Sequence, residues 1–273
     1  MYDQVDQLGV NTLRILSIDA IQRANSGHPG LPMGAAPMAY VLWTRHLKIN
    51  PKTHMNWVNR DRFVLSKGHA APVLYSALAR RGYFPVEELS TLRKFKSRLQ
   101  GHPSIQYLPG IDMSTGSLGQ GVSAAVGMAL AGKIDENDYR VYTLLGDGEL
   151  EEGQVWEAAM CAAHYKLNNL TAFIDFNGLQ IDGDITKVMN PCPIDKKFEA
   201  FGWNVLVIYG HNYEEIIDAI EKAKECKDKP TAVVCNTVKG KGVSFMENQA
   251  AWHGTAPSKE QCETALKELG GEI

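Results

Sequence analysis

The sequence predicts an α/β fold, with a doubly wound, mainly parallel sheet and helices on both of its faces. Short apolar runs rich in Val, Ile and Leu alternate along the chain with longer segments of helical periodicity. This alternation indicates parallel strands that are buried on both sides. The chain, residues 1–273, contains no repeat and no linker-like stretch, and its length allows one large domain or two small ones.

The elements follow in a regular order. Apolar residues recur on one side of the segment 3–24, as in an amphipathic helix. The further predicted helices span 32–46, 69–80, 117–133, 153–165, 193–201, 213–226 and 258–269. The predicted strands span 62–65, 141–145, 170–176, 205–209 and 231–236.

Composition excludes several classes of protein. With 28 Lys and Arg against 31 Asp and Glu, the net charge of −3 gives no electrostatic case for nucleic acid. No apolar run reaches 18 residues, so we expect no membrane partner, and residues 1–8 lack the apolar core of a secretory signal. Five cysteines without a Cys-x-x-Cys pair argue against a zinc ribbon or a disulfide framework and indicate a reducing, cytoplasmic location.

Two predicted strands end in turns that suit a phosphate and a metal. The strand 141–145 runs into Gly146-Asp147-Gly148, and the strand 170–176 runs into Asn177-Gly178. Glycine lets the backbone approach a phosphate closely, and carboxylate and amide oxygens suit Mg²⁺ or Ca²⁺. Either turn alone would be ordinary; together, at the binding edge of a parallel sheet, they indicate a site.

Two other phosphate motifs are excluded. The stretch from Gly127 to Lys133 has the glycine spacing of a P-loop, but Ile134 follows where a hydroxyl is needed, and the stretch ends a helix pattern. No Gly-x-Gly-x-x-Gly follows a predicted strand, so a dinucleotide fingerprint is absent.

Seven stretches, in order along the chain, resemble the N-terminal, thiamine diphosphate-binding part of transketolase. They are Asn25-Ser26-Gly27-His28-Pro29-Gly30, Ser66-Lys67-Gly68-His69, Gly101-His102-Pro103, Thr115-Gly116-Ser117-Leu118-Gly119-Gln120-Gly121, Gly146-Asp147-Gly148-Glu149-Leu150-Glu151-Glu152-Gly153, Asp175-Phe176-Asn177 and Trp252-His253-Gly254. The resemblance covers residues 25 to 254. It implies a single diphosphate-binding domain over residues 1–273 and, as cofactors, thiamine diphosphate with Mg²⁺ or Ca²⁺.

The resemblance also implies roles around the diphosphate. Asp147, Asn177 and the backbone carbonyl of Leu179 would hold the metal. The Gly148 N–H and the His69 side chain would face the diphosphate, with Asn177 beside it.

Further implied roles concern the rest of the cofactor and the sugar. Gly116 and Leu118 would pack against the cofactor near its aminopyrimidine, and Glu152 would be a carboxylate at the interface between two active sites. Three histidines would line the channel to the thiazolium C2 and bind the hydroxyls of the sugar donor: His28, His102 and His253.

The remaining histidines and acidic residues receive plainer interpretations. We expect solvated surface positions for His46, His54, His164 and His211. We expect Glu149 and Glu151 to stabilise the first turn of a helix through its dipole.

Two departures from the family affect the prediction. Ser117 stands where many members have Pro, a mild change. More important, a complete transketolase continues into pyrimidine-binding and C-terminal domains, which supply the glutamate at N1′, the stacking aromatic residue and most of the grip on sugar phosphates. We therefore expect a partner chain that carries those domains. The helix 117–133 is dense in small residues, which suits close packing within the chain or against a second copy in an α2β2 assembly.

Three functions remain open from the sequence. The first is a subunit of a split transketolase, which moves a two-carbon ketol unit from a ketose phosphate to an aldose phosphate, as in the pentose phosphate pathway. The second is a split relative: a dihydroxyacetone synthase, a 1-deoxyxylulose-phosphate synthase or a transketolase for a modified sugar. The third is a non-catalytic assembly subunit, which the intact Asp147, Asn177 and histidine set disfavours.

Overall fold

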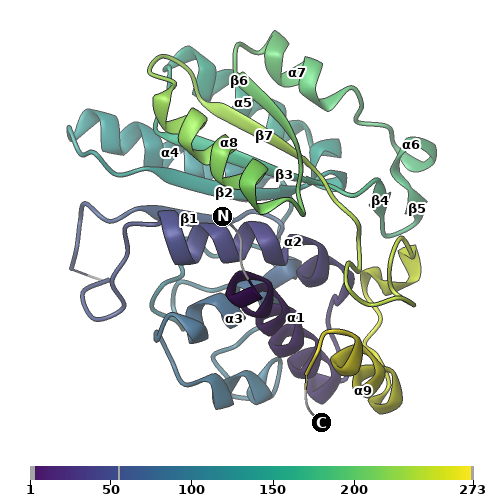
Figure 1. The fold of residues 1–273 in the computed structure, drawn as a ribbon. Coiled ribbons are helices and arrows are strands. Elements are labelled where there is room, and N and C mark those ends of the chain that lie inside the picture. Colours follow the sequence, from purple (N-terminus) through teal and green to yellow (C-terminus); the bar gives the residue numbers. More distant parts are fainter. Residues whose placement is uncertain (1–3, 55, 272–273) are drawn as a thin grey trace.

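The computed structural model describes residues 4–54 and 56–271 and shows a sheet between two layers of helices (Figure 1). The helices are α1 (Gln4–Ala24), α2 (Gly30–Val41), α3 (Ala71–Arg80), α4 (Gln120–Ile134), α5 (Gly153–His164), α6 (Ile185–Val188), α7 (Ile194–Ala200), α8 (Tyr213–Glu225) and α9 (Lys259–Glu268). The strands are β1 (Arg62–Leu65), β2 (Val141–Gly146), β3 (Leu170–Phe176), β4 (Leu179–Gln180), β5 (Gly183–Asp184), β6 (Asn204–Tyr209) and β7 (Thr231–Asn236).

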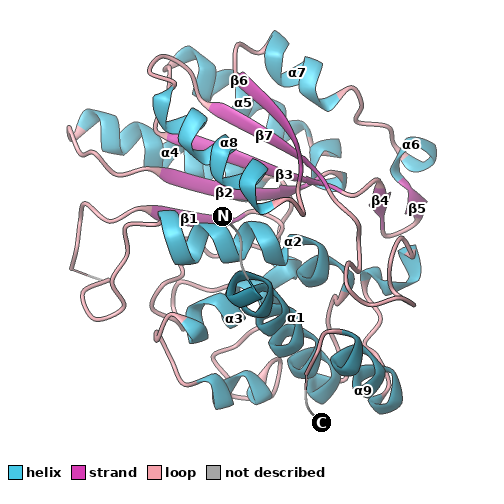
Figure 2. Ribbon diagram, in the orientation of Figure 1, coloured by secondary structure: helices cyan, strands magenta, loops and turns pink. Residues whose placement is uncertain are grey.

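The main sheet confirms the predicted fold class. Its five strands lie in the order β1-β2-β3-β7-β6, and every neighbouring pair is parallel (Figure 2). Each main strand lies within one residue of its predicted bounds. In the register, Gly146 of β2 is opposite Asp175 of β3, and Asp175 is opposite Cys235 of β7. The loops that follow β2, β3 and β7 therefore leave the sheet at the same edge.

Alternating side chains of the strands build a core on each face of the sheet. On one face, residues such as Phe63 and Leu144 join a cluster with α1, α2, α3 and α8. On the other face, Val64 and Ile174 join a cluster with α4, α5 and α7. A third, smaller cluster packs α9 against α1. Both faces are covered, which explains why the strands have continuous apolar runs.

The helix bounds differ from prediction where special backbone geometry intervenes. Helix α4 begins at Gln120 instead of residue 117, because Gly119 has a left-handed φ of +80° that ends the preceding loop. The predicted helix 32–46 is α2 followed by a π-helical turn over Leu42–His46. The β4–β5 hairpin, α6 and a 3₁₀ turn over Val86–Thr91 were not predicted. Residue 3 of the first predicted helix lies outside the described residues.

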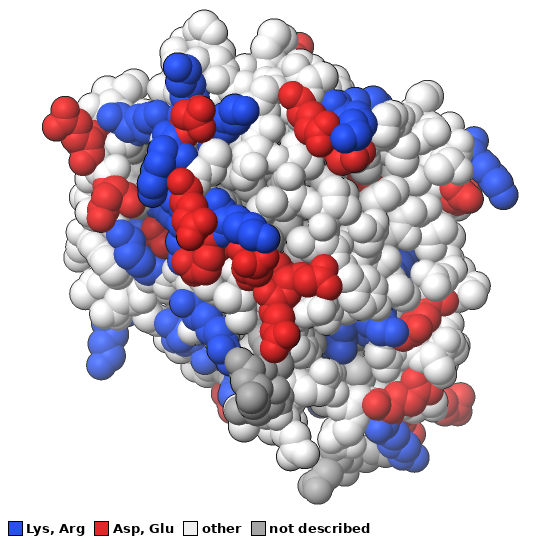
Figure 3. Space-filling model, turned by 45° about the horizontal axis from the view of Figure 1, so that its top comes forward, with Lys and Arg blue, Asp and Glu red and all other residues white. Residues whose placement is uncertain are grey.

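The charges on the surface and the apolar content of the helices match what the composition indicates. On the face shown in Figure 3, Lys and Arg side chains are interspersed with Asp and Glu. Among the described helices, none has both the length and the apolar character needed to cross a bilayer. The P-loop-like stretch ending in Gly132-Lys133 lies inside α4, as expected for a coincidental match.

Candidate active site

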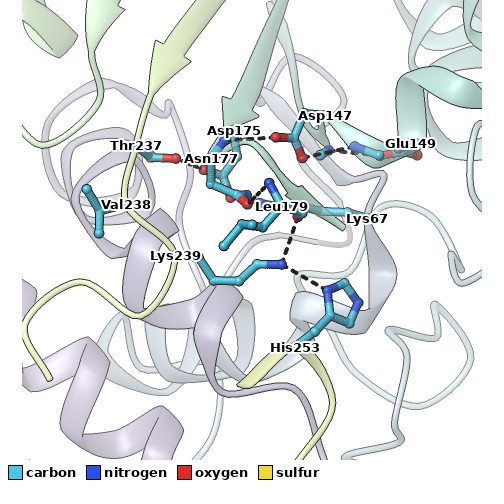
Figure 4. A network of polar contacts seen from close by, with 12 residues as sticks. Lys67, Asp147, Glu149, Asp175, Asn177, Leu179, Thr237, Val238, Lys239 and His253 are labelled. Carbon is cyan, nitrogen blue, oxygen red and sulfur yellow. Dashed lines mark hydrogen bonds and ion pairs between the residues drawn. The ribbon is translucent and has the colours of Figure 1, made fainter. Parts of the chain in front are cut away.

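A cavity of about 440 Å³ opens at the carboxyl edge of the sheet. Loops after β1, β2, β3 and β7 contribute to it or to the polar network beneath it (Figure 4). Of the eleven predicted site residues, ten line the cavity: His28, His69, His102, Gly116, Leu118, Asp147, Gly148, Glu152, Leu179 and His253. The eleventh, Asn177, lies beside Asp147. The structure thus brings the predicted residues together, while their individual roles remain predictions.

Asp147 ties the ends of β2 and β3 to each other. One carboxylate oxygen accepts the N–H of Gly148 at 2.9 Å. The other accepts the N–H groups of Asn177 at 2.9 Å and Gly178 at 2.6 Å. Burial, reinforced by the nearby Asp175 carboxylate, raises the pKa of Asp147 to about 6. A divalent cation beside this carboxylate would favour its ionised form.

The oxygen atoms around Asp147 fit a hard divalent cation. The Asn177 side-chain oxygen accepts the Leu179 N–H at 3.1 Å, and within the described part of the chain its buried Nδ2 has no hydrogen-bond partner. The Leu179 carbonyl accepts Lys239 Nζ at 2.8 Å. No cluster of three His, Cys, Asp or Glu side chains among the described residues could hold a metal alone. A carboxylate, an amide and a carbonyl suit Mg²⁺ or Ca²⁺ with its remaining positions filled by phosphate oxygens.

A buried ion pair lies beneath the Gly146-Asp147 turn. Lys67, fully buried at the end of β1, donates to Asp175 of β3, whose second oxygen accepts the Thr237 hydroxyl after β7. Burial works against the charge of Asp175, but the Lys67 ammonium outweighs it and holds the pKa of that carboxyl below its usual value. Three strand ends are therefore fixed relative to one another. Lys67 and Asp175 each belong to a recognised motif, but the sequence does not indicate that they pair.

Lys239 was missed by the sequence analysis. It is 1% exposed, and besides the Leu179 carbonyl its Nζ lies 3.1 Å from His253 Nδ1 (Figure 4). Burial lowers the pKa of Lys239 to about 8. A hydrogen bond also fixes the loop that carries Lys239, because the Val238 N–H donates to His211 Nε2 at 2.8 Å. The available signal was the position of the loop directly after a predicted strand.

Three histidine rings form one cluster on the cavity wall. The ring centroids of His28, His69 and His253 lie 5.1–5.5 Å apart. Burial, with the neighbouring cationic groups second, lowers the pKa of His28 to about 4 and that of His253 to about 3, and it also lowers the pKa of His69. Neutral rings each offer one donor and one acceptor nitrogen. Such a wall can bind hydroxyl and carbonyl oxygens without carrying charge.

Residues 5–272 match the family model described as the thiamine diphosphate binding domain of transketolase. The chain belongs to the transketolase family. The cavity at the strand ends therefore lies within a domain of the kind that binds thiamine diphosphate in that family.

Curated relatives of this transketolase domain fall into two kinds. The 6-deoxy-6-sulfo-D-fructose transketolase subunit SqwG of Clostridium sp. (strain MSTE9) is 46% identical over 271 residues, which are 98% of each chain. The transketolase of Streptococcus pyogenes serotype M6 is 45% identical over 278 residues, which cover 97% of this chain and 38% of the relative. The domain thus spans less than half of the second kind and nearly all of the first.

Solved transketolases share the fold. The structure from Campylobacter jejuni matches with a TM-score of 0.94 and 41% identity, over 100% of this chain and 44% of the other. A complex of the Pichia stipitis enzyme with sedoheptulose 7-phosphate matches with a TM-score of 0.93 and 37% identity. This match covers 99% of this chain and 41% of the other.

Close backbone approaches explain two of the family's glycines here. A Cβ on Gly116, whose φ is +149°, would lie 3.0 Å from the ring of His102. A Cβ on Gly68 would lie 2.8 Å from the Gly116 backbone nitrogen. Side chains at either position would push apart the loops that carry His69 and His102.

The prediction for Glu149 was right in position and wrong in role. Glu149 lies in the first turn of a short helix, the 3₁₀ turn Gly148–Glu151, but its side chain is 2% exposed and binds groups outside that turn. The 3₁₀ turn Gly148–Glu151 directs its carboxylate under the loops, where it accepts from the Ser66 hydroxyl and from the N–H groups of Gly119 at 2.9 Å and Gly146 at 3.2 Å. Burial raises its pKa. Glu151 and Glu152, by contrast, are exposed.

Three of the four histidines predicted to lie on the solvated surface are buried or half-buried instead. His54 is 3% exposed and contacts the Tyr83 hydroxyl at 2.8 Å. His46 has a side chain 7% exposed and pairs with Glu221 at 3.2 Å. His211 is half-buried behind the Lys239 loop. Their partners are distant in sequence, so local context could not place them. His164 is exposed at the end of α5, as expected.

Proposed function

We propose that this chain is the thiamine diphosphate-binding subunit of a transketolase. It would transfer a two-carbon ketol unit from a ketose phosphate to an aldose phosphate together with a partner chain that carries the pyrimidine-binding and C-terminal domains. The observation that carries this proposal is that the Asp147 turn and the neutral histidine wall line the same cavity. The chain as a whole would form one diphosphate-binding domain.

The roles of the chain's own residues follow from their contacts. Thiamine diphosphate, when bound, supplies carbanion stabilisation. Asp147, Asn177 and the Leu179 carbonyl would hold Mg²⁺ or Ca²⁺, while the Gly148 N–H and His69 face the diphosphate. Gly116, Leu118 and Glu152 lie along the cavity wall that continues toward the expected pyrimidine side and the interface. Donor hydroxyls would be bound by His28, His102 and His253.

The partner proposal rests on what the cavity contains. Acidic residues near it are Asp147 and Glu149, both engaged by backbone N–H groups, and the exposed Glu151 and Glu152. The pyrimidine-side glutamate and the stacking aromatic residue would come from the partner. The small-residue helix α4 would contribute to contacts between two copies in an α2β2 assembly, located in the cytoplasm.

Calorimetry of cofactor binding tests the metal and diphosphate assignment. The chain is titrated with thiamine diphosphate in EDTA, in Mg²⁺ and in Ca²⁺, alone and with the partner. We expect binding only with a divalent cation, and tighter binding with the partner by linkage. Asp218→Asn, an exposed acid on α8, is the matched control for Asp147→Asn. Metal-independent binding would refute the assignment.

A donor carrying a C6 sulfonate is the second candidate substrate. It is favoured by one observation: the relative that matches this chain end to end is named as a 6-deoxy-6-sulfo-D-fructose transketolase subunit. Because the resemblance places the grip on the anionic end of the sugar in the partner, this chain's histidine wall suits either donor. The reconstituted pair is therefore assayed with fructose 6-phosphate and with 6-deoxy-6-sulfofructose. The ratio of the two kcat/KM values decides between the candidates.

A further inference from the structure

Arg93 lies beside His28, one of the residues that line the cavity. It precedes His102 in a loop where its φ is +58°, and its backbone N–H donates to the Leu99 carbonyl at 2.8 Å. Burial lowers the pKa of its guanidinium. No ion pair found in the described part of the chain includes Arg93. A half-buried arginine held in this way serves something other than a surface salt bridge.

The guanidinium contacts two of the recognised motifs at once. Its NH1 donates to the Ser26 hydroxyl at 2.9 Å, and its NH2 lies 3.5 Å from His28 Nδ1. It also lies against Gly101, where a Cβ would be 3.1–3.3 Å from the guanidinium atoms. Ser26 and Gly101 have no other role in the proposed site. Their contacts with the guanidinium explain both: Ser26 accepts its hydrogen bond, and Gly101 leaves room for it.

The chemistry of the two groups decides the protonation of His28. A guanidinium has only N–H donors, whereas a neutral imidazole has one donor and one acceptor nitrogen. A proton on Nδ1 would point at another donor, so the favourable tautomer has Nδ1 bare and Nε2 protonated. The 3.5 Å separation is long for a hydrogen bond, but the repulsion between two donors acts at that distance as well.

The surroundings of His28 support a neutral ring. Its pKa is lowered to about 4 by burial first, then by Arg93, His102 and Lys239. The rings of His69 and His253 stand edge-on to it at 5.1 and 5.5 Å. None of these groups is a carboxylate that could stabilise a charged imidazolium. Nε2, the ring nitrogen that does not contact Arg93, lies beside Gly254, where a Cβ would be 3.7 Å from it.

We propose that Arg93 is a positioning residue that fixes His28 as the neutral Nε2–H tautomer. His28 thereby offers the cavity a hydrogen-bond donor for a sugar oxygen and cannot accept a proton at that nitrogen. The role toward the sugar rests on the proposed function, but the tautomer is a property of the chain itself. An experiment can therefore refute the tautomer of His28 without refuting the proposed function, and the reverse.

Nitrogen NMR of the histidine side chains in the purified chain tests the proposal without cofactor or partner. Long-range ¹H–¹⁵N spectra distinguish a protonated from a bare ring nitrogen, and the spectrum of His28→Gln identifies the His28 signals. We expect Nδ1 bare and Nε2 protonated between pH 6 and pH 8. In Arg93→Met we expect a mixture of tautomers and a higher pKa for His28. The matched control is Lys94→Met, an exposed cation of the same loop.

A second variant disturbs the contact between Arg93 and His28 without removing Arg93. Gly101→Ala places a methyl group against the guanidinium and should shift His28 in the same direction as Arg93→Met, and circular dichroism checks that both variants are folded. A protonated Nδ1 in the unmodified chain would overturn the proposal. So would an unchanged His28 tautomer in folded Arg93→Met.

Discussion

Replacing Lys67 by Met should destabilise the chain strongly. The methionine keeps most of the buried stem that passes under Gly146, where a Cβ would lie 3.5 Å from the Lys67 Cδ, and removes only the charge. Asp175 then keeps the Thr237 hydroxyl but loses its counter-charge in a fully buried position. Removing one partner of a buried ion pair costs about 3–5 kcal/mol. That is a large share of the roughly 5–15 kcal/mol by which a typical domain is stable against unfolding.

The loss should depend on pH in a defined direction. In the unmodified chain the pKa of Asp175 is below its usual value, so the pair stabilises the fold above the unfolded pKa, and this contribution is lost as pH falls. Without Lys67, burial raises the pKa of Asp175, and the variant loses stability as pH rises through that pKa. The difference between the two proteins should therefore shrink toward acidic pH.

Urea denaturation followed by circular dichroism at several pH values measures this. Lys67→Met/Asp175→Asn should recover part of the loss, because no uncompensated charge is left in the core. Lys222→Met, from an exposed pair with Asp218, is the control and should cost less than about 1 kcal/mol. A loss below about 1 kcal/mol for Lys67→Met, or one that grows toward acidic pH, would refute the reasoning.

Three further predictions concern the cavity. Asp147→Asn should remove Mg²⁺-dependent binding of thiamine diphosphate in calorimetry, and wild-type affinity would contradict the metal assignment. His102→Ala and His253→Ala should each raise the KM of the donor in the reconstituted enzyme by about 5- to 150-fold, the equivalent of about 1–3 kcal/mol for a lost buried hydrogen bond. Neither should change the cofactor affinity as much, and equal losses would count against their placement. Glu149→Gln should lower the urea midpoint, because its new NH₂ group faces a backbone N–H where an acceptor stood; an unchanged midpoint would contradict that account.

The strands, and the meeting of Asp147 and Asn177 at one edge of the sheet, could be predicted because their signals are local. A continuous apolar run marks a buried parallel strand, and Asp147 and Asn177 each follow such a run directly. Parallel strands end at one edge, so the sheet topology alone brings the two residues within hydrogen-bonding reach. The same logic placed His69 after β1 at that edge.

The supporting residues could not be predicted because their partners are remote in the sequence. Lys67 and Asp175 are 108 positions apart, and Arg93 reaches Ser26 across 67. Glu149 was assigned to a helix start because its pattern fits one. Its burial depends instead on the Ser66 hydroxyl and the Gly119 N–H from two other loops, and on the Gly146 N–H at the end of β2. Such pairings appear only when the loops are packed together.

Ketol transfer by separated and recombined chains tests the central claim most directly. The purified chain, checked by mass spectrometry to be free of partner, is assayed with thiamine diphosphate, Mg²⁺, a ketose phosphate or sulfonate donor and an aldose phosphate acceptor. The assay is repeated with a chain that carries the pyrimidine-binding and C-terminal domains, alone and mixed with this one. We predict a folded but inactive chain and transfer only in the mixture, abolished by Asp147→Asn. Full transfer by this chain alone would contradict the account.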